Sequence, residues 1–160
     1  MTAPLTDPPL LRVEHLGVRL PGPAGTTPVL DDVSLAVRPG RTTGVIGESG
    51  SGKSMLAMAI IGLLPEGGTA TGRILLRDED LLGADARRRR QVRGREISMI
   101  FQDPLSALNP SQRIGRQVGE ILRRNGGGRT AAARAAVDLM TEVGIQDPGV
   151  RSRDYGDQFS

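Results

Sequence analysis

Apolar and polar residues alternate near the start of the chain, and this pattern predicts β-strands between residues 10 and 37. Val33, Leu35 and Val37 alternate strictly with polar or small neighbours. A Pro/Gly-rich stretch, residues 21–28, predicts a turn between two such runs. Shorter β-prone runs at residues 42–46, 74–76 and 97–101 predict further strands.

Helical patterns follow in two places. Residues 55–64 are apolar on nearly every face, which predicts a buried helix that stops at Pro65. After Pro110, two apolar stripes at helical spacing predict two more helices, separated by glycines 126–128. We expect Thr130 to cap the second of these and Gly144 to follow its end. The stripes consist of Ile114, Val118, Ile121 and Leu122, and of Ala133, Ala136, Val137, Met140 and Val143.

Composition narrows the class of protein. The 160 residues are about one domain's worth, with 38% hydrophobic and 24% charged residues, as in globular proteins. The lack of cysteine excludes disulfides, thiolate metal sites and a cysteine nucleophile. No apolar run is long enough to span a membrane, and residues 1–9 read as a flexible Pro-rich tail without the features of a secretory signal. These features predict a cytosolic protein.

The net charge is +3, and most of the cations are arginines. They are concentrated at residues 87–90, with Arg93 and Arg95 close behind. The simplest interpretation is a solvated basic face. A phosphate-binding groove, or contact with anionic lipid or an acidic partner, is an open alternative. A nucleic-acid-binding protein is a further hypothesis, although no aromatic platform for bases accompanies the arginines.

The strongest motif is a glycine-rich loop that matches G-x-x-x-x-G-K-[ST]. Glycines allow the backbone to turn its N–H groups around a polyphosphate, and the following helix N-terminus adds positive potential. Lys53, the only lysine of the chain, is expected to reach the β- and γ-phosphates, and Ser54 to ligate Mg²⁺. The candidate nucleotide-binding residues are Gly47, Glu48, Ser49, Gly50, Ser51, Gly52, Lys53 and Ser54.

This loop alone does not distinguish among classes of nucleotide-binding protein. A GTPase would need a guanine-selective N-K-x-D segment, and the chain has none, because Lys53 is its only lysine. No feature favours a nucleoside kinase.

A second motif block indicates the family. Residues 97–110 read ISMIFQDPLSALNP, and together with GESGSGKS and GRILLRDEDLL they resemble the ATP-binding subunit of ABC transporters. The wording is similar to the branch that imports dipeptides, oligopeptides or nickel. The resemblance implies an α/β fold of the P-loop NTPase (RecA-like) type with an N-terminal antiparallel β-subdomain and the start of an α-helical subdomain. It implies an incomplete core over residues 10–101, a Q-loop at 102–110 and the helical subdomain at 111–160.

The resemblance also implies roles and partners. Gln102 matches the Q-loop glutamine, which positions the attacking water and Mg²⁺, so ATP and Mg²⁺ are the expected cofactors. Residues 106–110 would lie near the groove that receives the permease. The expected partners are permease subunits, a second identical or different ATPase subunit and, indirectly, a solute-binding protein, with no nucleic acid. The expected location is peripheral, at the cytoplasmic face of the cell membrane.

Some features depart from the family pattern. Leu20 stands where relatives place an aromatic residue against adenine, and Gly156 and Asp157 differ from the usual residues before the signature motif. No Walker B strand or catalytic glutamate follows Gln102, and Asp138 lies in a helical stripe instead. We therefore expect these 160 residues alone to hydrolyse no appreciable ATP. The alternative hypothesis is a truncated, non-catalytic nucleotide-binding remnant.

Overall fold

The computed structural model describes residues 7–23, 25–104, 107–124 and 126–158. The chain divides into two compact units, residues 1–99 and 100–160. In the described residues, no helix is long and apolar enough to cross a membrane.

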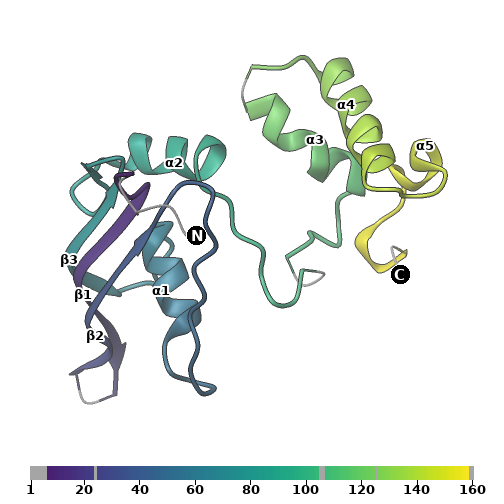
Figure 1. Ribbon diagram of the computed structural model, residues 1–160. Coiled ribbons are helices and arrows are strands. Elements are labelled where there is room, and N and C mark those ends of the chain that lie inside the picture. The colour runs from purple at the N-terminus through teal and green to yellow at the C-terminus, as the bar shows by residue number, and fades with distance from the viewer. Residues whose placement is uncertain (1–6, 24, 105–106, 125, 159–160) are drawn as a thin grey trace. The chain divides into compact units, whose positions relative to one another are not determined.

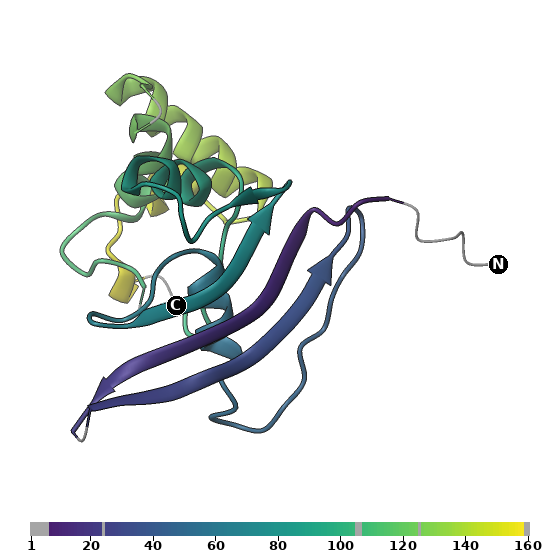
Figure 2. The ribbon, with the colours of Figure 1, turned by 90° about the vertical axis from the view of Figure 1, so that its left-hand side faces the viewer.

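The first unit is built on an antiparallel sheet with the strand order β2-β1-β3-β4. Its strands are β1 (Leu11–Gly22), β2 (Gly25–Val37), β3 (Thr69–Leu76) and β4 (Glu79–Asp80). Figure 2 shows β1 and β2 as a long curved hairpin, with β3 beside β1. The predicted strands between residues 10 and 37 and at 74–76 are confirmed, and the hairpin turn is tighter than predicted because Gly22 already pairs with Gly25.

Two helices complete this unit, α1 (Lys53–Ile60) and α2 (Ala86–Arg95). The core is made by the inward residues of the sheet together with one side of each helix. Its buried members include Val13, Leu16, Val18 and Ile74 from the strands, Leu56 and Ala59 from α1, and Val92 from α2. The α1 helix, which carries the end of the glycine-rich loop, is therefore anchored on the sheet by apolar burial.

The second unit is helical and contains α3 (Ile114–Arg124), α4 (Arg129–Glu142), α5 (Pro148–Arg151) and the 3₁₀ turn η1 (Gly156–Gln158). Figure 1 shows α3 and α4 packed side by side. Gly119 makes the close approach possible, since a Cβ there would lie 2.8 Å from the Ala132 carbonyl oxygen. The two predicted helices and the glycine break between them are confirmed.

Two predicted strands, at residues 42–46 and 97–101, are wrong: both segments have no regular secondary structure. Ile46 is 99% exposed and Ile100 is 89% exposed. A strand forms only where a neighbour accepts and donates its backbone hydrogen bonds, and neither segment pairs with any described strand. Their β-prone sequences therefore have no partner strand within the described residues.

Helix boundaries and faces also differ from the pattern. The α1 helix ends at Ile60, before the predicted Leu64, because Gly62 takes a positive φ of 66°. Only one side of α1 is fully buried, since the helix lies on the sheet surface. Gly128, instead of Thr130, is the N-cap of α4, whereas Gly144 follows the helix end with a φ of 78° as predicted. Several residues predicted for the buried stripes are exposed: Ile121, Leu122, Ala133 and Val143.

Candidate functional site

The glycine-rich loop lies at the N-terminus of α1, as its sequence predicts. Gly52 is the N-cap of the helix and has a φ of 91°, and Gly50 has a φ of 83°. These left-handed conformations are readily adopted only by glycine, so the spacing of glycines sets the path of the loop. A Cβ on Gly52 would also lie 2.6 Å from Leu30 Cδ2 and 3.1 Å from the Val29 carbonyl oxygen. The end of the loop is thus packed directly against β2.

The Lys53 side chain folds back over the loop. Its ammonium donates hydrogen bonds to the carbonyl oxygens of Gly47 at 2.8 Å and Glu48 at 2.6 Å, and to Ser51 Oγ at 3.2 Å. The lack of a side chain at Gly47 keeps this space open, because a Cβ there would lie 2.7 Å from Ser51 Oγ. The only lysine is therefore held at the centre of the loop, where its charge faces any anion that the loop encloses.

Backbone donors are available at the same place. The first hydrogen bond of α1 runs from the Leu56 N–H to the Gly52 carbonyl, so the N–H groups of Lys53, Ser54 and Met55 have no partner within the helix. Ser54 is exposed in this first turn, and Ser49 and Ser51 are exposed in the loop. Free amides, a helix N-terminus and one ammonium form the arrangement that binds polyphosphates.

The sequence predicts Ser54 and Gln102 as ligands of Mg²⁺, and these two residues belong to different units of the chain. A hydroxyl oxygen and an amide oxygen are hard donors of the kind that Mg²⁺ accepts beside nucleotide phosphates and water. No group of three or more His, Cys, Asp or Glu side chains in the described residues is arranged to hold a metal.

Gln102 lies in the second unit, in an exposed segment without regular secondary structure rather than at the predicted strand end. Of the residues expected near the permease, Ser106 lies outside the described residues. Further along, Gln117 of α3 fixes the backbone: its Oε1 accepts the Asn109 N–H at 2.8 Å, and its Nε2 donates to the Asn109 and Gln112 carbonyls at 3.0 Å and 2.8 Å. No sequence signal identified Gln117, because its role depends on a loop that returns to the helix.

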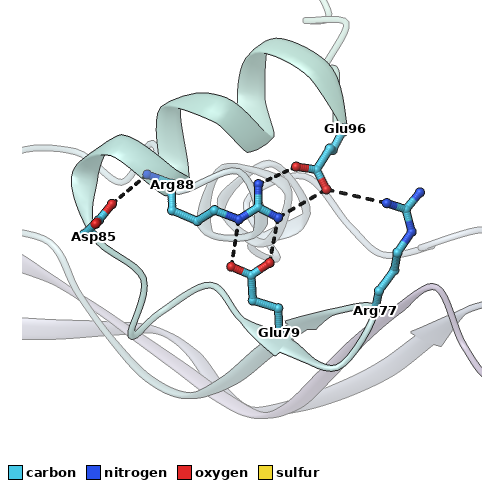
Figure 3. Close-up of polar contacts among 5 residues, drawn as sticks. All are labelled: Arg77, Glu79, Asp85, Arg88 and Glu96. Atoms are coloured by element: carbon cyan, nitrogen blue, oxygen red, sulfur yellow. Dashed lines mark hydrogen bonds and ion pairs between the residues drawn. The ribbon is translucent and has the colours of Figure 1, made fainter.

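The basic stretch of α2 contributes to the structure of the first unit. Figure 3 shows the Arg88 guanidinium between two carboxylates, bonded to both oxygens of Glu79 at 2.7 and 2.6 Å and paired with Glu96. Arg77 adds an ion pair to Glu96 at 3.6 Å. The hydrogen bonds from Arg88 lower the pKa of Glu79 and of Glu96 below the ordinary glutamate value, and the two carboxylates raise the pKa of Arg88.

A second arginine of α2 also points inward. Arg93 donates to the carbonyl oxygens of Ile61 at 2.9 Å and Gly62 at 3.2 Å, at the end of α1. The prediction of a wholly solvated basic face is therefore wrong for Arg88 and Arg93, although Arg87 and Arg90 are exposed. The sequence could not distinguish these arginines, because carboxylates and carbonyls distant in sequence select them.

Two other sequence predictions concern single residues. Leu20 is half-buried and packs against the core, close to Gly68 before β3. Asp138 is exposed on α4, which confirms that it belongs to a helix and not to a strand end. Gly156 and Asp157 lie in η1, and Phe159 and Ser160 lie outside the described residues.

Comparisons with known proteins agree on one family. The family profile described as ABC transporter matches residues 30–160. The dipeptide transport ATP-binding protein DppD of Bacillus subtilis is 40% identical over 154 residues, which are 94% of this chain and 46% of that protein. The probable D,D-dipeptide transport ATP-binding protein DdpD of Escherichia coli is 43% identical over 87% of this chain and 43% of that protein.

Solved structures show the same fold. The dimeric structure of MJ0796, a bacterial ABC transporter cassette, superposes with a TM-score of 0.75 at 18% identity, over 94% of this chain and 63% of that chain. A second structure of that cassette, in a post-hydrolysis state bound to ADP and Pi, gives the same values. The chain spans less than half the length of the two curated relatives described above.

Proposed function

The chain belongs to the ABC transporter family, and from this membership we propose that it binds MgATP as part of a subunit that energises import of peptides through a membrane permease. The observation that carries the proposal is the position of Lys53, whose ammonium is held over the loop by the Gly47 and Glu48 carbonyls. Phosphate oxygens are stronger acceptors for an ammonium than carbonyl oxygens. A triphosphate therefore takes over these bonds when it enters the loop.

Each part of the loop has a task in this proposal. Gly47, Glu48, Ser49, Gly50 and Gly52 present backbone N–H groups, and the first turn of α1 adds three more donors. Ser51 contributes its hydroxyl, because its N–H already donates to the Glu48 carbonyl at 3.2 Å. The Ser54 hydroxyl and the Gln102 amide oxygen would hold Mg²⁺, which would supply positive charge to offset that of the phosphates. Gln102 also orients the water near the terminal phosphate.

The wider assignments rest on the family and on the names of the relatives. Residues 10–101 form the nucleotide-binding part of the core, 102–110 the Q-loop and 111–160 the helical subdomain. The Bacillus subtilis relative is a dipeptide transport ATP-binding protein, which supports peptides as the imported class. The partners are permease subunits and a second ATPase subunit, and the chain works peripherally at the cytoplasmic face of the membrane. Hydrolysis requires a catalytic carboxylate beyond these 160 residues.

Titration of the 160-residue chain with ATP in the presence of Mg²⁺ tests the binding site. We expect Lys53→Ala to weaken binding roughly tenfold or more, as loss of a charge-assisted hydrogen bond implies. Arg41→Ala is the matched control. It also removes one positive charge, but from the exposed stretch that precedes the loop. Absence of binding to the folded chain, or an equal loss in both variants, would contradict the proposal.

The imported class needs a separate test in cells. In an amino-acid auxotroph that carries the native gene, we expect Lys53→Ala to prevent growth on a dipeptide that contains the required amino acid. Growth on the free amino acid should be unchanged. Normal growth of the variant on the dipeptide would argue against peptide import. It would not bear on the proposal that the glycine-rich loop binds ATP.

A further inference from the structure

A cleft in the second unit has a strongly basic lining. It lies along α3 and the first turns of α4 and has a volume of about 580 Å³. Four arginines line it: Arg113, Arg116, Arg123 and Arg129. No acidic side chain of the described residues is among its lining, so the charge is concentrated in one hollow of the surface.

Small residues make up much of the rest of the lining. Gly119 and Ala132 bring α3 and α4 together, and Ala133 adds only a methyl group. Gly115 packs closely on Ser152, where a Cβ would lie 2.8 Å from the Ser152 carbonyl oxygen. The lining therefore combines four long arginine side chains with glycine, alanine and serine residues that leave the cleft open.

Three of these arginines, Arg113, Arg116 and Arg129, have no acidic partner among the described residues. No carboxylate in the described part of the chain lies within ion-pair distance of Arg116 or Arg129. Arg113 lies 6.0 Å from the centroid of the Tyr155 ring, a contact that leaves its charge uncompensated. Arg123 pairs with Glu120 at 3.1 Å, but that carboxylate also pairs with Arg124 at 3.4 Å. This contrasts with α2, where Arg88 is held by two carboxylates.

We propose that this cleft is a second anion site, separate from the glycine-rich loop, and that it binds a phosphate group. Planar guanidinium groups match phosphate oxygens with paired hydrogen bonds. The four guanidinium groups around the cleft offer more N–H donors than the one neighbouring carboxylate, that of Glu120, can accept. The volume accommodates a polyphosphate or a lipid phosphate headgroup, which share this chemistry.

The test uses the 160-residue chain in a Lys53→Ala background, so that the glycine-rich loop does not contribute. Inorganic tripolyphosphate is titrated by calorimetry, and backbone amide shifts are followed by NMR. The site variant is Arg116→Gln with Arg129→Gln. The matched control is Arg90→Gln with Arg134→Gln, which removes the same charge from exposed positions outside the cleft. Vesicles of phosphatidylglycerol, compared with phosphatidylcholine vesicles, test the lipid source.

We expect saturable binding that the site variant weakens roughly tenfold or more and the control weakens less than about twofold. The NMR shifts should concentrate at Gly115, Gly119 and Ala132. Binding of tripolyphosphate with this pattern identifies a soluble phosphate as ligand, and binding of phosphatidylglycerol vesicles alone with this pattern identifies a headgroup. No binding of either probe, or equal losses in the site and control variants, would overturn the proposal. Circular dichroism of both variants separates a lost site from a lost fold, and Arg116→Lys with Arg129→Lys should restore binding only in part, because lysine keeps the charge and loses the paired hydrogen bonds.

Discussion

At the scale of single residues, two glycines of the glycine-rich loop have similar backbone conformations and different surroundings. A side chain on Gly50 would meet open space, whereas one on Gly52 would collide with Leu30 and approach the Val29 carbonyl. We expect Gly50→Ala to cost about 1–2 kcal/mol of unfolding free energy from its positive φ alone. Gly52→Ala should cost about 1–3 kcal/mol more, because overpacking is added to the strain.

Chemical denaturation of the two variants measures this difference. The signal to follow is the unfolding of the β-sheet, because Leu30, which a side chain at position 52 would displace, belongs to its core. Equal losses in Gly50→Ala and Gly52→Ala would contradict the packing of the loop against β2.

The Arg88 network gives the first unit a pH dependence. Because the folded-state pKa values of Glu79 and Glu96 lie below the ordinary 4.5, their contribution to stability is present above that pH. This contribution is lost as the pH falls through the lowered folded-state pKa values. Below them the two glutamates are protonated in the folded protein as well as in the unfolded protein. We expect Arg88→Met to flatten this fall in unfolding free energy between about pH 5 and about pH 2.

Arg87→Met is the control for this prediction, since Arg87 is exposed on the same helix. The profiles come from urea denaturation at each pH. An unchanged acid limb in Arg88→Met would show that the two carboxylates do not depend on this guanidinium.

The sequence could identify those residues whose role depends only on their neighbours in sequence. The glycines and Lys53 follow from the local geometry of a loop at a helix start, and the structure places them there. Arg88 and Gln117 were missed, because their partners approach only after strands and loops have folded together. The charge of Arg88 gave no indication that it differs from Arg87.

At the scale of elements, close packing of α3 on α4 reverses the usual effect of a helical glycine. Replacing glycine by alanine in a helix ordinarily stabilises by about 0.5–1 kcal/mol. We expect Gly94→Ala in α2 to follow this rule, because its Cβ would meet nothing within 4 Å. Gly119→Ala should instead destabilise by about 1–3 kcal/mol, since its Cβ would press on the Ala132 backbone. Thermal unfolding followed by circular dichroism measures both, and a stabilised Gly119→Ala would contradict the helix pair.

Elements with local signals were predicted well, and elements that need distant partners were not. The β1–β2 hairpin and the α3–α4 pair close over short connections, so alternation and helical spacing were enough to find them. The runs at 42–46 and 97–101 have the same β propensity but no partner strand in the described residues. The β propensity of a residue describes how well its side chain fits a sheet. It does not supply the neighbouring strand that a new strand needs.

At the scale of the whole molecule, the proposed site draws on both units of the chain. The glycine-rich loop belongs to residues 1–99 and Gln102 to residues 100–160. The proposed role of Gln102 therefore requires bound nucleotide to hold its segment. The segment is otherwise open to proteases, because residues 100–104 are exposed and have no regular secondary structure.

Limited proteolysis tests this coupling between the units. We expect chymotrypsin to cut first after Phe101, which is 41% exposed, and intact mass to identify fragments 1–101 and 102–160. MgATP should slow this cut in the parent chain, since nucleotide and Mg²⁺ engage Gln102 and restrict the backbone that the protease must bind. At the same MgATP concentration, Lys53→Ala should reduce the protection by weakening nucleotide binding, whereas Gln102→Ala should bind ATP and gain less protection. A cut after Phe101 that proceeds equally fast with and without bound MgATP would remove Gln102 from the site and leave the glycine-rich loop unaffected.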